Sequence, residues 1–422
     1  MYDILIIGSG LSGLHCAYQL QHTFKKICIL EKEGRIGGRI QTVHTHGMSM
    51  EAGAGRFNQH HECVHKLIKA LDLESAKIEI PSDLEFTPSG STYNSAHKTM
   101  YKHLNPFDIL SPILKKGYLA NKQKLRTQTF MEFARSVEPN VDHVQFILDS
   151  FGYYEQLVHM NAYDALKLFD KGMHTRNKFY TLREGMSSII ESLCNRMPDV
   201  PIYTGHEVNK IEYVPYEDEP HFLVSVQNRK TPYKTRQCIC AIPQIALKKI
   251  PFFRVIRPLL DTIGVKILCR IYAIFDPNDN WFEHIPKTTT NNGNRYIIPI
   301  NREKGLIMIA YTDSVYAKYW KSLSSKPDAV FSQLQQNIQD TFGFTIGRPK
   351  YLKAFYWETG TAFWKPHFNS DELYKKIMKP IHSMPLYICG ENFSQSQGWM
   401  EGALETSWDV IRMIERELPI TK

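Results

Sequence analysis

Residues 2–8 read YDILIIG, residues 9–24 read SGLSGLHCAYQLQHTF, and residues 25–33 read KKICILEKE. The alternation of apolar runs, a glycine turn and a helical pattern predicts one strand–helix–strand unit. Gly8, Gly10 and Gly13 form G-x-G-x-x-G, and Glu31 follows Gly13 by 18 residues. The glycines allow a tight turn, close approach to a pyrophosphate and close packing of helix on strand, while Glu31 can accept from ribose hydroxyls. The stretch therefore predicts a dinucleotide-binding domain of Rossmann type.

This pattern fits NAD and FAD equally well, so the residues that follow must discriminate between the two cofactors. The second strand runs into EKEGRIGGRI, residues 31–40, where Gly37, Gly38 and Arg39 follow within one turn-rich loop. A second glycine anchor so close to the first suits a long, bent cofactor that is held along its length.

Composition narrows the class of protein. The 422-residue chain is 43% apolar with a net charge of +8, and its basic clusters are short and lack interleaved aromatic residues, so we expect no nucleic-acid partner. Eight cysteines without regular spacing favour free thiols and a cytoplasmic location. No apolar run approaches the roughly 20 residues of a membrane helix, and the first strand has no export pattern before it. We therefore expect no membrane association.

The rest of the chain predicts a discontinuous arrangement. Apolar residues recur at helical spacing over residues 61–73, and several short helices are predicted between about 105 and 170. A final helix is predicted from about Trp399. Strand patterns occupy residues 202–214, 222–226, 237–242, 264–275, 295–300, 306–312 and 352–357.

Several motifs, in order, resemble those of the flavin-containing amine oxidase family, which includes monoamine, polyamine and L-amino acid oxidases. They are GSGLSG (8–13), EKEGRIGGR (31–39), GAGR (53–56), LREGMSSI (182–189), HEVNKIE (206–212), GVKI (264–267) and GENFSQSQGWMEGALETS (390–407). The motifs are most similar to those of L-amino acid oxidases. The resemblance implies an α/β fold with a discontinuous Rossmann-like FAD-binding domain of the glutathione-reductase type. That domain would comprise residues 1–60, 179–256 and 382–422. Residues 61–178 and 257–381 would form a substrate domain with a mixed sheet and a helical part at about 105–178.

The resemblance also implies which residues would contact FAD. At the nucleotide and phosphate end these are Gly8, Gly10, Leu11, Ser12, Gly13, Glu31, Lys32, Gly38, Arg39 and Val208. At the ribityl and flavin end they are Gly53, Ala54, Gly55, Arg56, Glu391, Gly398, Trp399, Met400 and Ala403. Val208 would meet the adenine, Arg39 the phosphates and Glu391 the ribityl chain. The helix after Gly398 would stabilise negative charge on the reduced ring.

Two further expectations concern the flavin ring. Lys266, in GVKI, matches the family lysine that holds a water against flavin N5. Monoamine oxidases carry FAD on a cysteine in the segment before the last strand, whereas WETGTAFWKP (residues 357–366) contains no cysteine. FAD is therefore expected to bind noncovalently.

The prediction of the substrate class rests on Arg56. In L-amino acid oxidases an arginine at this place in G-x-x-R receives the substrate carboxylate, because a guanidinium meets two oxygens in a bidentate pair. Gly398 and Trp399 match the residues that line the substrate site, with Trp399 as one wall of an aromatic cage; simple core packing is its alternative role. Those oxidases also share the carboxylate with a tyrosine, and RYIIPI (295–300) has Ile298 or Pro299 at that place. The carboxylate clamp would then be incomplete, and Arg56 could instead serve a structural ion pair.

One motif suggests a different enzyme. HECVH, residues 61–65, matches the zinc protease pattern H-E-x-x-H, and Glu85 has a spacing that suits a third ligand. However, Pro81 and Pro88 disfavour the helix that would present Glu85. We therefore expect no metal site.

The expected reaction is oxidative deamination of an amine, most simply an L-amino acid, with Lys266, Arg56 and Trp399 in the catalytic site. Hydride would pass to flavin N5, and oxygen would reoxidise the flavin and give hydrogen peroxide. A polyamine or monoamine oxidase, a flavin desaturase and a flavin-bound regulatory protein are the alternatives. His159 and His206 are candidates for a base by residue type only. The oligomeric state stays open, a dimer included.

Overall fold

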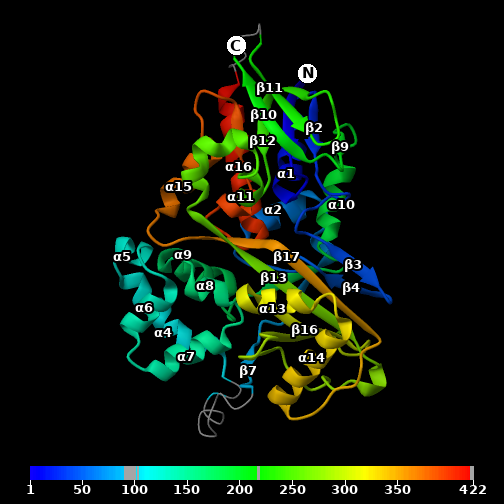
Figure 1. Ribbon diagram of the computed structural model, residues 1–422, viewed down its shortest axis with the longest axis vertical. Coiled ribbons are helices and arrows are strands. Elements are labelled where there is room, and N and C mark those ends of the chain that lie inside the picture. Colours follow the sequence, from blue (N-terminus) through cyan, green and yellow to red (C-terminus); the bar gives the residue numbers. More distant parts are fainter. Residues whose placement is uncertain (90–100, 102–103, 216–218, 419–422) are drawn as a thin grey trace.

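The computed structural model describes residues 1–89, 101, 104–215 and 219–418, which form two large sheets and a helical part (Figure 1). The first sheet has the strand order β10–β11–β12–β1–β2–β9, and β18 also pairs with β12. The strands are β1 (Tyr2–Ile7), β2 (Ile27–Leu30), β9 (Ile202–Tyr203), β10 (Val208–Val214), β11 (His221–Val226), β12 (Tyr233–Cys240) and β18 (Leu386–Ile388). Strands β1, β2, β9, β12 and β18 run parallel, as expected for a dinucleotide-binding sheet.

Helices cover this sheet because its central strands are apolar on both faces. Residues 4–7 of β1 and all of β2 are buried, the pattern of a parallel sheet with both faces covered. One core contains the sheet and its helices α1 (Leu11–Leu20), α2 (Glu62–Ala70), α10 (Ser187–Asn195) and α16 (Met400–Glu417). A second core on the other face includes α11 (Gln244–Leu247), α12 (Arg257–Leu260) and α15 (Ser370–Met378).

The second sheet is mixed and has the order β17–β13–β16–β15–β14–β7. Its strands are β7 (Glu85–Phe86), β13 (Ile263–Ile274), β14 (Thr288–Thr289), β15 (Tyr296–Asn301), β16 (Leu306–Asp313) and β17 (Tyr351–Trp364). Helices α13 (Ser314–Leu323) and α14 (Pro327–Phe342) pack on it in one core, around Trp320. The long β13 and β17 cross the middle of the molecule in Figure 1, between the first sheet and the rest.

Short helices form a separate group beside the second sheet (Figure 1). They are α4 (Pro106–Leu119), α5 (Lys122–Arg126), α6 (Phe130–Val137), α7 (Val141–Ser150), α8 (Tyr154–Val158) and α9 (Ala162–Lys167), followed by a π-helical turn (Leu168–Met173). Two small sheets complete the fold: β3 (Thr42–Thr45) with β4 (Met48–Glu51), and β5 (Phe57–Asn58) with β8 (Phe179–Leu182) and β6 (Lys77–Ile80).

The α/β class, the strand segments and the short helices are confirmed, with three differences in strand length. The strand predicted at residues 237–242 is β12, which begins earlier, at Tyr233, and ends at Cys240. Residues 202–214 split into β9 and β10 at Gly205, whose φ of 69° interrupts the strand. Strand β17 continues to Trp364 because it pairs with β13 from Tyr351 to the far end.

The packing of helix α2 disagrees with the predicted domain division, which assigned residues 61–178 to the substrate domain. Val64, Leu67 and Ile68 share the core of α1 and α16. We therefore propose that the boundary lies after α2, and otherwise the division stays a prediction.

Candidate active site

One large cavity of about 1530 Å³ lies between the glycine turn of the first sheet and the second sheet. Residues from both sheets and from the helical part line it. Every residue predicted to contact cofactor or substrate lines this cavity except Gly13, which packs behind the turn. The sequence motifs, spread over about 400 residues, therefore converge on one space.

The nucleotide end is formed by the turn between β1 and α1. A Cβ at Gly13 would lie 2.0 Å from the Gly8 carbonyl oxygen, so only glycine lets the helix approach the strand this closely. Gly10 is the N-cap of α1 and has no side chain, which leaves the first N–H groups of the helix for an anion. Leu11 and Ser12 follow on the cavity wall.

Glu31 directly follows β2 and is buried at this end of the cavity. Its Oε2 accepts hydrogen bonds from the backbone N–H and the hydroxyl of Ser9, at 2.9 and 2.7 Å, and its Oε1 accepts from the Glu33 N–H. These bonds hold the carboxylate in one orientation. Val208 and the exposed Lys32 line the same end.

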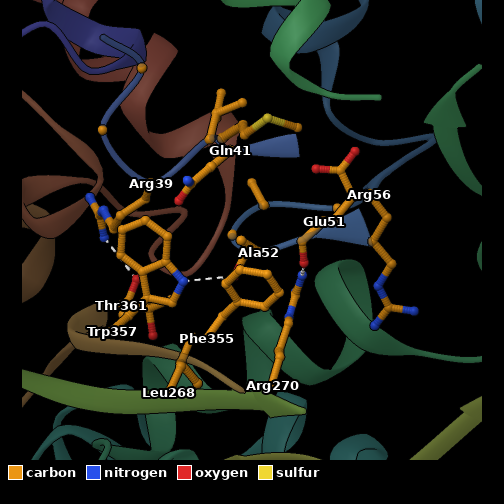
Figure 2. Close-up of a pocket in the computed structure, with 18 of the residues that line it drawn as sticks. Arg39, Gln41, Glu51, Ala52, Arg56, Leu268, Arg270, Phe355, Trp357 and Thr361 are labelled. Carbon is orange, nitrogen blue, oxygen red and sulfur yellow. Dashed lines mark hydrogen bonds between the residues drawn. The ribbon is translucent and has the colours of Figure 1, made fainter. Parts of the chain in front are cut away.

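The loop of residues 51–56 is held against both sheets. The Ala54 N–H donates to the Arg39 carbonyl at 2.9 Å, and a Cβ at Gly53 would lie 1.9 Å from that oxygen. Strands β13 and β17 hold the other side: Arg270 Nη1 donates to the Glu51 carbonyl and Trp357 Nε1 to the Ala52 carbonyl, both at 2.7 Å (Figure 2). The loop that would pass beside the flavin is thus rigid.

Arg39 and Glu391 form a partly buried ion pair, and both line the cavity. Arg39 Nη1 lies 2.6 Å from Glu391 Oε2 and also donates to the Gly360 carbonyl. Glu391 Oε1 accepts from the N–H groups of Ala362 and Gly398. Burial alone would raise the pKa of Glu391, but Arg39 and these donors lower it overall. Glu391 therefore carries a negative charge that fixes the loop before α16.

Lys266 is buried in β13, at the point where the β13–β17 register shifts. Its Nζ lies 3.9 Å from Asp313 Oδ2 and 5.0 Å from the ring centre of Tyr153. Burial lowers the pKa of Lys266, although the charge of Asp313 opposes that shift. Asp313 accepts from the N–H groups of Tyr154 and Glu155, so it also joins α8 to the second sheet.

Arg56 extends from the loop into the cavity, away from the contact between Arg270 and Glu51 (Figure 2). Its guanidinium carbon lies 4.3 Å from the ring centre of Phe179 and 5.9 Å from that of Trp399. Over the described residues no carboxylate lies within 4.0 Å of Arg56. The structural ion pair considered above is therefore absent from that part of the chain.

Trp399 is the N-cap of α16 and is half-buried on the cavity wall. It makes an edge contact with His61, at 4.8 Å between ring centres, and stacks on Phe179 at 6.4 Å. Its Nε1 is buried and has no hydrogen-bond partner among the described residues. Trp399 thus combines core packing on one side with a surface toward the cavity.

Three tyrosines that the sequence did not single out line the other side of the cavity: Tyr153, Tyr296 and Tyr311. Their ring centres lie 5.1–5.9 Å apart. The positive charge of Arg56 acts on both Tyr153 and Tyr296 and opposes the rise of their pKa values caused by burial. Ile298 and Pro299, the residues expected at the place of the family tyrosine, also line the cavity, and Tyr296 adds a phenol two residues before Ile298. The β15–β16 register shifts between Tyr296 and Ile298, and both side chains lie on the cavity wall.

The HECVH stretch has other hydrogen-bond partners. Asn58 N–H donates to His61 Nδ1, and His65 Nε2 lies 3.2 Å from the Asn58 carbonyl. Glu62 is exposed and pairs with Lys66. Glu85 lies in β7 and not in a helix, and the described residues contain no group of three His, Cys, Asp or Glu that could hold a metal.

Neither candidate base lies beside Lys266. His206 lines the nucleotide end and bonds through Nδ1 to the Thr204 carbonyl at 2.7 Å. His159 is largely exposed beside Glu155 and does not line the cavity.

Comparison with known proteins places this arrangement in a family. Residues 11–410 match the family model described as flavin containing amine oxidoreductase. The chain belongs to the flavin-containing amine oxidoreductases. The resemblance inferred from the motifs is thereby confirmed. The L-amino-acid oxidase of Bothrops atrox is 21% identical to this amine oxidoreductase over 99% of the chain and 90% of its own length. Aplysianin-A of Aplysia kurodai is 21% identical over 97% of the chain and 89% of its own length.

Solved structures show the same fold. A double mutant of putrescine oxidase superposes with a TM-score of 0.76 at 14% identity, covering 98% of this amine oxidoreductase and 99% of that chain. Wild-type putrescine oxidase bound to putrescine has a TM-score of 0.73. At this identity the likeness concerns the fold.

The cofactor of this amine oxidoreductase is FAD, and the cavity fits it. The glycine cradle and the free end of α1 suit a pyrophosphate, and the space continues without a break to Lys266 and Trp399. All eight cysteines are described, all are free thiols, and none lines the cavity, consistent with noncovalent binding. No helix in the described ranges is long and apolar enough to cross a membrane.

Proposed function

We propose that this amine oxidoreductase is an oxidase that deaminates an L-amino acid. The observation that carries the proposal is Arg56, a guanidinium that lines the cavity beside Trp399 and has no carboxylate partner among the described residues. A carboxylate of the substrate would supply that partner in a bidentate pair. The distal ammonium of a diamine would instead meet a like charge there, which argues against a polyamine.

The protein residues would orient the amino acid between the flavin and the aromatic walls. Arg56, with the phenol of Tyr296 nearby, would bind the carboxylate, and Trp399 would pack on the substrate. Gln156 lines the same space and has a buried side-chain oxygen with no partner in the described chain, so it can accept from the amine. Lys266, held by Asp313, would position water at the flavin edge.

Bound FAD would accept two electrons from the carbon that bears the amine and pass them to oxygen. Amino acid, oxygen and water would give a 2-oxo acid, ammonia and hydrogen peroxide. The protein would contribute to the rate mainly by orienting the substrate against the cofactor. The eight free cysteines support a cytoplasmic location, which stays a proposal.

Substitution of Arg56 tests the substrate class. In Arg56→Met, kcat/KM for L-leucine should fall about tenfold to a hundredfold, the worth of a charge-assisted hydrogen bond. Turnover of 3-methylbutylamine, which lacks the carboxylate, should change little. Peroxide release measures both. Arg56→Lys should be intermediate because an ammonium lacks the guanidinium fork.

Arg302→Met is the matched control, since Arg302 is exposed at the cavity rim and donates to two backbone carbonyls. Unchanged amino-acid turnover in Arg56→Met would remove the carboxylate role. A wild-type preference for the amine would favour a monoamine or polyamine oxidase. A flavin that no amine or amino acid bleaches without oxygen would favour a regulatory protein.

A further inference from the structure

A second cation lines the substrate side of the same cavity. We propose that Lys287 binds an acidic side chain of the substrate and that the enzyme therefore acts on dicarboxylic amino acids. This inference rests on the proposed function, in which Arg56 holds the α-carboxylate.

The backbone holds Lys287 in a fixed place. It immediately precedes β14, whose Thr288 and Thr289 are fully buried, and its carbonyl accepts from the Glu85 N–H at 3.1 Å. Strand β14 pairs with β7 on one side and with β15 on the other. Because β15 also carries Tyr296, the strands bring Lys287 to the wall that faces Arg56.

The ammonium of Lys287 has no carboxylate within 4.0 Å over residues 1–89, 101, 104–215 and 219–418. The other cations of this side have partners: Lys266 has Asp313, and Arg270 has the Glu51 carbonyl. Over the described residues, by contrast, the side chains of Arg56 and Lys287 have neither a carboxylate nor a backbone carbonyl as a hydrogen-bond partner.

Burial and then the charge of Arg56 lower the pKa of Lys287 to about 7, while Asp83 opposes the shift. The two cations therefore act on each other through the cavity. Asp83 is exposed, which limits how much of this repulsion it can offset.

An uncharged substrate side chain would leave Lys287 desolvated and unpaired. A second carboxylate would supply the missing anion and relieve the repulsion between the two cations. Leu84 and Ile298 make part of the remaining wall apolar, and the carboxylates of Asp83 and Glu85, which also line the cavity, lie more than 4.0 Å from the Lys287 ammonium. Charge therefore selects an acidic side chain over an isosteric amide.

The holoenzyme allows a direct test with matched substrates. L-glutamate and L-glutamine, or L-aspartate and L-asparagine, differ in charge at nearly constant shape. We expect kcat/KM to be about tenfold to a hundredfold higher for the acids, the range of a charge-assisted hydrogen bond. Lys287→Met should abolish the preference, and Lys287→Arg should keep it. Lys304→Met is the control, because Lys304 lines the cavity but bonds to the Gly47 carbonyl.

Binding without turnover gives a second readout. Titration of the flavin absorbance should show glutarate binding about tenfold or more tightly than pentanoate, and Lys287→Met should remove this difference while retaining full flavin content. Equal turnover of acids and amides by the wild-type enzyme, or an acid preference that survives in Lys287→Met, would overturn the inference. In both cases neutral amino acids would still be oxidised through Arg56. Failure of the proposed function would instead appear as oxidation of amines without any amino-acid turnover.

Discussion

His61 shows how a residue with a catalytic appearance can be structural. The imidazole is 5% exposed, its Nδ1 accepts from the Asn58 N–H, and its ring contacts Trp399. Burial lowers the pKa of His61 to about 3, and the charges of His65, His60 and Arg56 add to the shift. The ring is therefore neutral inside the protein at any pH at which the enzyme would work.

The low pKa of His61 predicts a loss of stability in acid. Below a pH of about 6.5 the unfolded chain binds a proton that the folded chain does not. The free energy of unfolding therefore decreases as the pH decreases. The slope from His61 approaches 1.4 kcal/mol per pH unit on the way to pH 3. His61→Asn keeps an acceptor for Asn58 and removes the titration, so its stability should fall less between pH 6.5 and 5.

Urea unfolding at several pH values measures this difference. His22→Asn is the control, because His22 is exposed and should keep the wild-type slope. If His61→Asn loses stability as steeply as the wild type, the imidazole is already charged in the folded protein.

Among the elements, α2 depends on α16 for its N-terminus. His61 occupies the N-cap position, but its side chain makes no capping hydrogen bond. Instead, the carboxylate of Glu401 in α16 accepts hydrogen bonds from the N–H groups of Cys63 and Val64, at 2.9 and 3.0 Å. A carboxylate at this end also complements the helix dipole. This contact ties the HECVH helix to the helix that covers the flavin end of the cavity.

Removal of the Glu401 charge should therefore destabilise the fold. Glu401→Gln is expected to lower the free energy of unfolding by about 1–2 kcal/mol in urea. Glu62→Gln provides the comparison, since Glu62 lies in the same first turn but is exposed and pairs only with Lys66 at 3.7 Å. Its cost should stay below about 0.5 kcal/mol. Equal effects of the two changes would contradict a capping role for Glu401.

At the scale of the whole molecule, one cavity joins the two sheets and the helical part. Strands β13 and β17 reach the loop of residues 51–56 through Arg270 and Trp357, so both sheets contribute to the cofactor site. A ligand that fills this space stabilises both at once.

FAD should therefore raise the melting temperature of the apoprotein. At a concentration one hundred times its Kd the gain is about 2.7 kcal/mol. Riboflavin lacks the adenosine diphosphate part and cannot reach the end of α1, so its shift at the same concentration should be clearly smaller. Calorimetry of the apoprotein with each ligand checks this; equal shifts would show that the glycine turn does not contribute to binding.

Much of the cofactor site could be predicted from the sequence because its requirements are local. Gly8, Gly10 and Gly13 act within one turn, and the spacing to Glu31 equals one helix plus one strand. Such constraints appear as short motifs, and every residue predicted from them to contact cofactor or substrate, except Gly13, lines the cavity.

The tertiary structure decided the rest of the substrate side, beyond Arg56, Gly398 and Trp399. Tyr153, Asp313 and Lys287 stand in no recognisable motif. Pairing of β13 with β16 brings Asp313 to Lys266, a hydrogen bond from the Tyr154 N–H to Asp313 places Tyr153 nearby, and pairing of β14 with β15 puts Lys287 on the cavity wall. Pairing of β15 with β14 and β16 places Tyr296 and Ile298 together on the cavity wall, and a register shift of one residue would turn both side chains to the other face. Sequence thus determined the cofactor and the class of its chemistry and singled out Arg56, whereas the surroundings of Arg56 on the substrate side arise only when long-range pairing assembles them.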